Sequence, residues 1–310
     1  MKKKVIYKID SLYRDDFRVT GYEFGKGKKS VCIVGSIRGN EIQQLYTCSQ
    51  LVKRLKMLEE EGKIAPGKKI LVIPAVNPYS LNIKKRFWPT DNTDINRMFP
   101  GYDLGETTQR IAAGVFEVIK DYTYGMQFAS FYMPGKFMPH VRMMKTGFED
   151  VELAKMFGMP YVVLRKVRPY ETTTLNYNWQ LWDTKAFSIY TTSTNNVDKV
   201  SANTAIRCIL NFMSKEKIIQ YQGHDGYIST VLDDTELVPV RTTVAGIFES
   251  MVNVGEEVSE GQLLGRLTDP YEGEVIEELK SPVHGIVFFE HADPLTYADT
   301  AVFKLVVRQE

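Results

Sequence analysis

The stretch SVCIVGSIRGNE (residues 30–41) decides the fold of this chain. Its first half, Ser30–Gly35, is a compact apolar run, as expected of a strand buried on both faces of a sheet. The segment that follows, Glu41–Gly62, carries leucines at helical spacing. Because a buried strand leading into a helix is the repeating unit of α/β proteins, the stretch predicts a sheet with helices packed against its faces.

The same alternation continues on both sides of this stretch. Short strands are predicted before it, further buried strands after it, and a second amphipathic helix between them. The predicted strands are Val5–Ile9, Val19–Phe24, Lys69–Val76, Met126–Tyr132 and Tyr161–Arg165, and the second helix is Thr108–Lys120.

The texture of the sequence changes near Gly223. From there on helical periodicity is weak, and glycines separate short strands as in a small β-barrel or sandwich. We place a boundary between Tyr221 and Thr230, which predicts an α/β domain over residues 1–222 and an all-β domain over residues 223–310. The strands predicted in the second domain are Ala245–Phe248, Gly255–Val258, Gly261–Leu267 and Gly285–Phe289.

Composition limits the classes of function. The 310 residues carry a formal net charge of +1 with basic residues scattered along the chain, so no nucleic-acid partner is expected. The MKKK start lacks the apolar region of a signal peptide, and no apolar run could span a bilayer, so we expect a cytoplasmic protein without a membrane partner. Cys32, Cys48 and Cys208 are odd in number without CxxC spacing, which predicts buried free thiols.

Three polar segments should meet at the carboxyl edge of the sheet, where open α/β sheets bind their ligands. They are GSIRGNE (residues 35–41), the segment from Asn77-Pro78 to Arg86, and TDINRMFPG (residues 93–101). Each contributes an arginine, and a guanidinium is the natural bidentate partner of a carboxylate. The segments therefore predict a ligand-binding site at this edge of the sheet.

This ordered set resembles the succinylglutamate desuccinylase and aspartoacylase family, which is related to zinc carboxypeptidases. The family pattern is GxHGxE after the first strand, then NP…R, then DLNRxFPG, then DxH at the end of a later strand. The resemblance covers nearly the whole chain. It implies a zinc-carboxypeptidase-like mixed sheet flanked by helices, followed by a small all-β barrel-sandwich domain.

In that family a zinc ion is held by the histidine and glutamate of the first motif and by the later histidine. Glu41 matches the glutamate, but Arg38 stands at the first histidine position and Ala129 at the second. The second assignment is anchored by MPHVR (residues 138–142), which resembles the stretch the family places after its histidine. At the position of the general-base glutamate the chain has Tyr190.

These replacements remove the usual mechanism. An arginine is always protonated, so Arg38 places a permanent cation where zinc would bind, and no zinc cofactor is expected. Without the metal no bound water becomes acidic, and without the glutamate nothing evident accepts its proton. His140, His224, His284 and His291 do not have the spacing of a rebuilt zinc site, so Glu41 is interpreted as a remnant.

The resemblance also assigns roles to retained residues. Asn96 and Arg97 match the pair that grips a substrate carboxylate, and Arg86 matches the arginine that stabilises the oxyanion in an active enzyme. Arg38 adds a further cation to the substrate-binding set. The alternative is that these arginines form structural ion pairs with Asp94 and Glu41, and for Arg38 both interpretations remain open.

The C-terminal segment resembles a biotinyl- or lipoyl-like barrel-sandwich. Carrier domains of that type display a modifiable lysine at a hairpin tip, but the equivalent stretch TDPYEG (residues 268–273) has none. We therefore expect an unmodified barrel. Its role as a lid over the pocket or as a contact with a second copy of the chain stays open.

Two functions follow. The first is a zinc-free, catalytically silent relative that binds an amino-acid-like carboxylate or a protein partner in the old pocket. The alternative is an active metal-dependent hydrolase that removes an acyl group from an N-acyl amino acid and needs zinc. The sequence favours the first, because it accounts for the arginine at a metal-ligand position.

Overall fold

The computed structural model describes residues 1–12, 15–131, 133–224 and 226–308. The chain forms two compact units. The first consists of Met1–Ser130, Pro139–Thr191 and Asn195–Val231, and the second of Phe131–Met138, Thr192–Thr194 and Leu232–Glu310. The domain division expected at residue 222 stays a prediction. The compact units differ from it because two short segments from the first 222 residues belong to the second unit.

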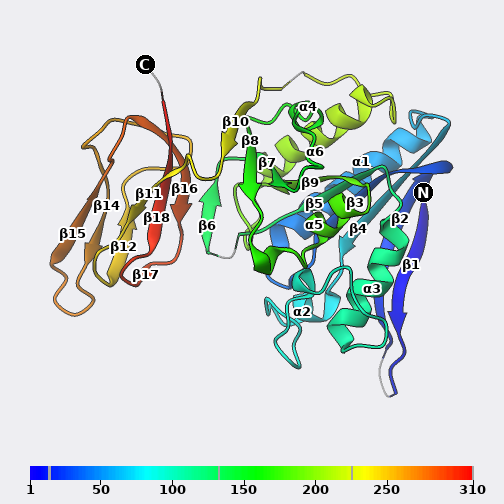
Figure 1. Ribbon diagram of the computed structural model, residues 1–310, viewed down its shortest axis with the longest axis horizontal. Helices are drawn as coiled ribbons and strands as arrows, with labels where there is room; N and C mark the ends of the chain where they lie inside the picture. The colour runs from blue at the N-terminus through cyan, green and yellow to red at the C-terminus, as the bar shows by residue number, and fades with distance from the viewer. Residues whose placement is uncertain (13–14, 132, 225, 309–310) are drawn as a thin grey trace. The chain divides into compact units, whose positions relative to one another are not determined.

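The first unit is built on a nine-stranded sheet in the order β1-β2-β4-β3-β5-β9-β7-β8-β10 (Figure 1). The central pairs β4/β3, β3/β5 and β5/β9 are parallel, whereas β1/β2, β2/β4 and β9/β7 are antiparallel. The sheet is therefore mixed, as predicted. Its strands are β1 (Lys2–Ile9), β2 (Phe17–Gly25), β3 (Gly27–Ser36), β4 (Gly67–Ala75), β5 (Tyr124–Phe128), β7 (His140–Lys145), β8 (Tyr161–Lys166), β9 (Lys185–Tyr190) and β10 (Thr230–Asp233).

Helices cover both faces of this sheet. Val31 and Ile33 of β3 point into a core with α1 (Ile42–Glu60) and α6 (Lys199–Lys215), next to the short α4 (Val151–Lys155). Cys32 and Val34 point the other way, into a core with α3 (Thr107–Ile119) and α5 (Leu175–Leu181). Successive side chains of a strand alternate between faces, so the continuous apolar run of β3 serves two cores at once.

Two of the sequence motifs form short helices at the end of the sheet. In α2 (Pro78–Asn82) the Asn77 side chain accepts a hydrogen bond from the Ser80 amide, and proline occupies the first turn. In the 3₁₀ helix η1 (Ile95–Arg97) the Asp94 side chain accepts from the Asn96 amide. Part of each motif is thus explained by helix capping. A second 3₁₀ helix, η2 (Pro169–Glu171), precedes α5.

The second unit contains two antiparallel sheets around its own apolar core. One has the order β11-β18-β16-β13, with β6 paired to β16, and the other has the order β15-β14-β12-β17. The all-β character predicted for this region is confirmed, and its description as a barrel-sandwich stays a prediction. The strands are β6 (Gly135–Phe137), β11 (Val238–Arg241), β12 (Gly246–Ser250), β13 (Glu257–Val258), β14 (Leu263–Thr268), β15 (Val275–Lys280), β16 (Gly285–His291), β17 (Leu295–Thr296) and β18 (Ala301–Val307).

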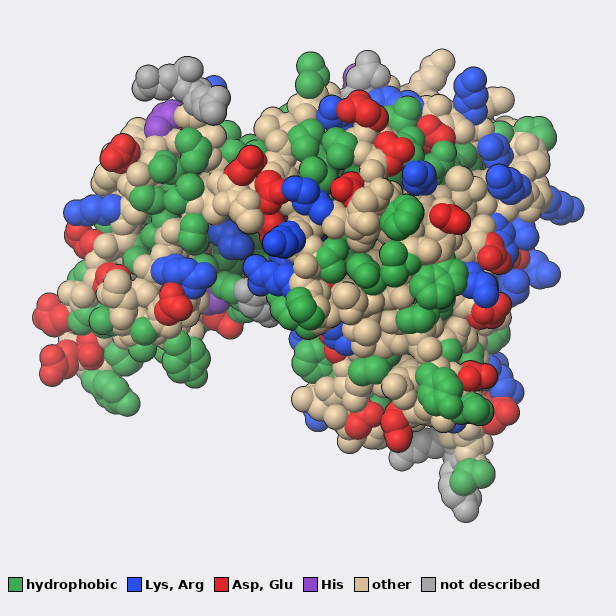
Figure 2. Space-filling model, viewed as in Figure 1, with side chains coloured by type: hydrophobic (Ala, Val, Ile, Leu, Met, Phe, Trp, Pro, Cys, Tyr) green, Lys and Arg blue, Asp and Glu red, His purple; other side chains and the backbone are tan. Residues whose placement is uncertain are grey.

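The distribution of surface charge and the burial of the cysteines agree with the expectations from the sequence. On the face seen in Figure 2, basic and acidic side chains are interspersed over the first unit. All three cysteines are free and buried. Within the described ranges, no helix combines the length and the apolar character that crossing a membrane would need.

Gly39 allows two of the loops that carry site residues to pack closely against each other. Its amide donates a hydrogen bond to the Arg86 carbonyl at 3.1 Å. A Cβ atom on Gly39 would lie 2.2 Å from the Lys85 carbonyl oxygen and 2.3 Å from the Ser80 carbonyl carbon. Only glycine allows the loop after β3 to approach the loop after α2 this closely.

We expect Gly39→Ala to lower the free energy of unfolding by about 1–3 kcal/mol, because the added methyl group must push backbone atoms apart. Urea denaturation measures the change. Gly62→Ala is the control, since a Cβ there meets nothing within 4 Å and only its positive φ of 70° is strained. An equal or smaller loss in Gly39→Ala than in the control would contradict the close approach.

Candidate functional site

A buried ion-pair cluster lies at the end of the sheet, centred on Arg38. Arg38 Nη2 lies 2.8 Å from Asp94 Oδ2, and its Nε lies 3.1 Å from both Asp94 oxygens. Arg38 Nη1 donates to Glu41 Oε1 at 3.1 Å. Only 4% of Arg38 is exposed. For Arg38, the structure therefore shows the structural ion pair, one of the two interpretations that the sequence left open.

The carboxylate of Glu41 is fully occupied by protein donors. Its Oε2 accepts from the backbone amides of Ile37 at 2.8 Å and Arg38 at 3.0 Å. Its Oε1 accepts from Arg38 and from the Ser130 hydroxyl. These four donors match the lone pairs that two carboxylate oxygens offer. Glu41 is therefore held as a structural carboxylate.

The end of β5 brings a third segment to this cluster. Ala129 donates its amide to the Ile189 carbonyl at 3.0 Å, and its carbonyl accepts from Gln44 Nε2 at 3.2 Å. The next residue, Ser130, places its hydroxyl 3.3 Å from Arg38 Nη1 and bonds Glu41. Ala129 thus directly precedes a residue of the cluster. Sequence reasoning missed Ser130, and a polar residue directly after a buried strand was the available signal.

These residues do not fit a zinc ion. Zinc needs neutral imidazole, thiolate or carboxylate ligands, usually three from the protein in a catalytic site. Across the described part of the chain, no group of three or more His, Cys, Asp or Glu side chains has the arrangement of a metal site. The one carboxylate at the expected place, Glu41, is saturated, and a guanidinium lies beside it.

The opposite charges of this cluster stabilise one another. Burial opposes the charge on Arg38, but Asp94 and Glu41 outweigh it and raise the Arg38 pKa. Burial likewise favours protonation of Asp94, yet Arg38 holds the Asp94 pKa below its usual value. One guanidinium and two carboxylates carry a net charge of −1, which neighbouring cations can balance.

Two further arginines lie within electrostatic range. The pKa values of Arg86 and Arg97 are lowered, first by burial and then by the positive charge of Arg38. Arg97 Nη1 donates to the backbone carbonyl of Asn96 at 2.9 Å, and Arg97 forms no ion pair with any carboxylate that the structure describes. The Arg86 guanidinium lies 5.5 Å from the ring centroid of Phe87. Arg97 is therefore a half-buried cation with donors to offer.

Asn96 connects this segment to α5. Its side-chain oxygen accepts from the Leu175 amide at 3.1 Å, and 7% of the residue is exposed. Its Nδ2 group donates to no residue in the described ranges. The side-chain oxygen therefore serves the fold, and the side-chain nitrogen keeps its hydrogen-bond donors.

Residue 190, the position predicted for the general base, carries an aromatic ring. Tyr190 stacks on His140 with ring centroids 4.5 Å apart and 7° between the planes. The Arg142 guanidinium lies 4.5 Å from the Tyr190 ring centroid. The phenol of Tyr190 supplies no carboxylate base at this position.

His284, one of the four histidines considered as zinc ligands, lies in the second unit and pairs with Glu257 at 3.1 Å.

A family model described as the succinylglutamate desuccinylase/aspartoacylase catalytic domain matches residues 27–213. The chain belongs to this family. The resemblance inferred from the motifs is confirmed, and the family is of the deacylase type.

Relatives support this membership at low identity. An N-alpha-acetyl-L-2,4-diaminobutyric acid deacetylase of Halomonas elongata is 20% identical over 281 residues, which covers 81% of this chain and 73% of that protein. A solved succinylglutamate desuccinylase from Silicibacter sp. TM1040 is 19% identical with a TM-score of 0.81, covering 99% of this chain and 93% of that one. A succinylglutamate desuccinylase/aspartoacylase from Rhodobacter sphaeroides is 20% identical with a TM-score of 0.79, covering 99% and 96%. The two structures confirm the family's fold.

Removal of the Arg38 charge tests the cluster. We expect Arg38→Met to lower the free energy of unfolding by about 3–5 kcal/mol at neutral pH, because two carboxylates then stay buried without their cation. Urea denaturation gives the value. Arg168→Met is the control, since Arg168 is exposed and its side chain bonds, among the described residues, only the Tyr170 hydroxyl. We expect a change within about 0.5 kcal/mol.

The loss of unfolding free energy in Arg38→Met should be smaller at acidic pH than at neutral pH. In the wild type the pKa of Asp94 is lowered, so its stabilising contribution is present above the unfolded pKa of about 3.9 and is lost as the pH falls. In Arg38→Met, burial without the cation raises that pKa, so the penalty grows as the pH rises. A difference between wild type and variant that is the same at about pH 7 and about pH 4.5 would contradict this account.

Proposed function

We propose that this family member is a zinc-free, catalytically silent protein whose pocket binds a small, amino-acid-like carboxylate. The observation that carries the proposal is the buried pairing of Arg38 with Glu41 and Asp94. A fixed cation takes the place of the metal, and the only family metal ligand still present is saturated by four donors.

Hydrolysis of an amide needs an activated water and a group that accepts its proton. Glu41 cannot serve as that group while Arg38, Ser130 and two backbone amides occupy both of its oxygens. The family's other carboxylate position carries Tyr190, whose ring contacts His140 and Arg142. The residues that remain are suited to hold a ligand, and none of them is placed to cleave one.

The charge at this edge of the sheet favours an anionic ligand. Arg38 is paired with two carboxylates, whereas Arg97 forms no ion pair with any carboxylate in the described ranges. A single guanidinium of this kind suits a monocarboxylate. Arg97 and the Nδ2 group of Asn96 provide charge-assisted and neutral hydrogen bonds, and partial burial strengthens the attraction.

The alternative is an active metal-dependent hydrolase that removes an acyl group from an N-acyl amino acid. Family membership favours it, and the relative from Halomonas elongata is named a deacetylase of an acetylated amino acid. For this chain it requires Arg38 to leave its ion pair and a metal to bind with fewer protein ligands. Metal content separates the two functions directly.

Ligand binding is tested by thermal shift with N-acetyl-L-alanine. We expect the wild type to be stabilised, and N-acetyl-L-alaninamide, which lacks the carboxylate, to have no effect. Arg97→Ala should weaken binding at least about tenfold, because a charge-assisted hydrogen bond is worth about 1.5–3 kcal/mol. Arg168→Ala is the matched control on an exposed arginine. Equal shifts in Arg97→Ala and wild type would rule out this pocket, and a screen of other amino acids and N-acyl derivatives follows the same scheme.

Zinc content is tested by elemental analysis after dialysis. The wild type should hold far less than one zinc per chain, and stoichiometric zinc would establish the metal-dependent alternative. The double variant Arg38→His with Ala129→His should gain zinc, about one per chain, because two imidazoles then join Glu41. A double variant that folds but takes up no zinc would show that residue 129 is not the third ligand position.

A further inference from the structure

A second pocket lies on the first unit, formed by β1, the loop after η1, α3 and the end of α5. Its volume is about 530 Å³, which is in the range of small-molecule sites. It shares no lining residue with the arginine site: Arg38, Arg86, Asn96 and Arg97 are absent from its walls. The pocket is therefore a separate feature of the unit.

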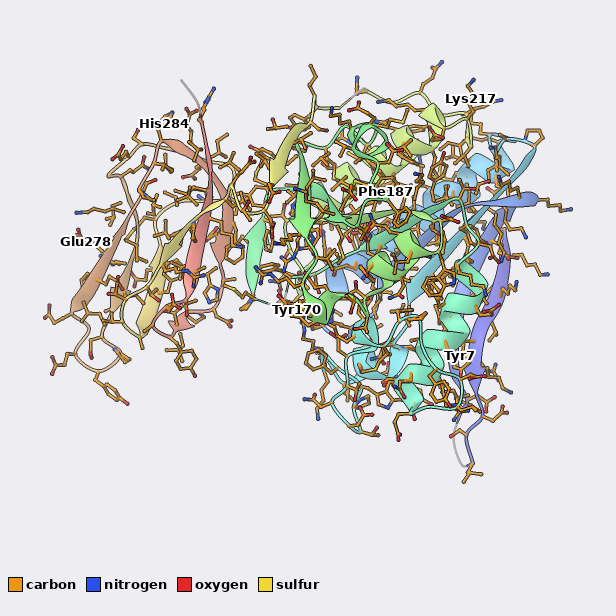
Figure 3. The ribbon with its side chains drawn as sticks, viewed as in Figure 1. Tyr7, Tyr170, Phe187, Lys217, Glu278 and His284 are labelled. Carbon is orange, nitrogen blue, oxygen red and sulfur yellow. The ribbon has the colours of Figure 1, made fainter. Side chains whose placement is uncertain are left out.

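Aromatic side chains form its walls. Trp182 and Tyr102 line it with 45% and 54% of their surfaces exposed, which is unusual for two large rings in one hollow. Tyr7 of β1 adds a third ring beside α3 (Figure 3). Trp182 is held edge-on against the buried Phe116 at 5.3 Å, so its position is set by the core.

Small residues form the floor. Gly114 of α3 lies under Tyr7, and a Cβ atom there would come within 2.1 Å of that ring. Gly101 has a φ of 98° and lies against the backbone of Ala113. The two glycines therefore let the Tyr7 ring and the loop after η1 pack closely on α3, and aromatic walls of this kind favour stacked or edge-on contacts with a ligand ring.

The pocket also offers one open charge of each sign. Glu117 pairs with Lys120 at 2.7 Å. Asp103 and Arg110 also line the pocket, and neither forms an ion pair or a side-chain hydrogen bond with any residue in the described ranges. A carboxylate is the natural partner of Arg110, and an ammonium group is the natural partner of Asp103.

We propose that this pocket binds a free aromatic amino acid. The ring packs against Trp182 and Tyr102, the carboxylate meets Arg110, and the ammonium group meets Asp103. Two features support it: the cavity with its exposed aromatic walls, and the pair of opposite charges without partners in the described ranges. This site lies beyond the proposed carboxylate pocket and does not depend on it.

The test uses L-phenylalanine as the probe, with calorimetry and tryptophan fluorescence on the full chain. Trp88 and Trp179 are 6% and 0% exposed, so a change in emission on binding reports Trp182. In Arg97→Ala, which lacks the cation of the carboxylate pocket, we expect saturable binding of L-phenylalanine and none of L-alanine, which lacks the ring. Trp182→Ala, Arg110→Gln and Asp103→Asn should each weaken binding at least about tenfold, whereas Trp182→Phe should retain most of it.

Two control variants show which pocket L-phenylalanine occupies. Arg97→Ala should bind L-phenylalanine as well as the wild type does, and so should Tyr170→Ala, which removes an exposed ring elsewhere on the unit (Figure 3). Loss of binding in Arg97→Ala alone would put the probe in the carboxylate pocket and overturn the proposal. Absence of binding, or equal affinity in Arg110→Gln and wild type, would also overturn it.

Sedimentation of the wild type and Tyr102→Ala completes the test. A monomer in both cases, together with saturable binding, supports a ligand pocket. A dimer that Tyr102→Ala dissociates would show that a second copy of the chain covers these rings, which would overturn the proposal.

Discussion

The buried guanidinium of Arg38 is the interaction on which the site depends. It joins residues from three segments of the chain. Glu41 lies after β3, Asp94 lies directly before η1, and Ser130 lies after β5. Taking an arginine out of water is costly, and that cost is offset only when the partners have good geometry and every remaining donor and acceptor is used. Two carboxylates, a hydroxyl and two backbone amides meet this condition, so the three segments are held together at one edge of the sheet.

In the proposed zinc-free site, this ion pair takes the structural role that a metal ion would have. A zinc ion would tie the same segments together through its ligands, and here a salt bridge does so. The surrounding arginines keep their places because their backbone is set by helix caps and by the close approach at Gly39. The proposed function treats the pocket as retained and the catalytic centre as changed, since function belongs to the site and not to the fold.

The segment after Asp94 contributes to two different surfaces. Asp94 faces the ion-pair cluster and Arg97 supplies the cation proposed to hold a carboxylate, whereas Gly101 lines the aromatic pocket. Phe99, between them, is fully buried against Phe116 and accepts a hydrogen bond from Asn178. Phe99 therefore holds the middle of the segment in the core, with Arg97 before it and Gly101 after it in the chain.

The sequence by itself determined the local elements. The helix expected at Glu41–Gly62 is Ile42–Glu60, and the one expected at Thr108–Lys120 is Thr107–Ile119, because apolar periodicity depends only on near neighbours. The run expected at Met126–Tyr132 is a strand as far as Phe128, and Tyr132 lies outside the described residues. Only the tertiary structure decided which carboxylates pair with Arg38, since Asp94 is 56 residues away, and that Ser130 joins them. It also decided that β6 pairs with β16 and that Tyr7 closes a pocket with Trp182. Ion pairs, strand pairing and cavities depend on distances between remote residues, and no local pattern encodes those distances.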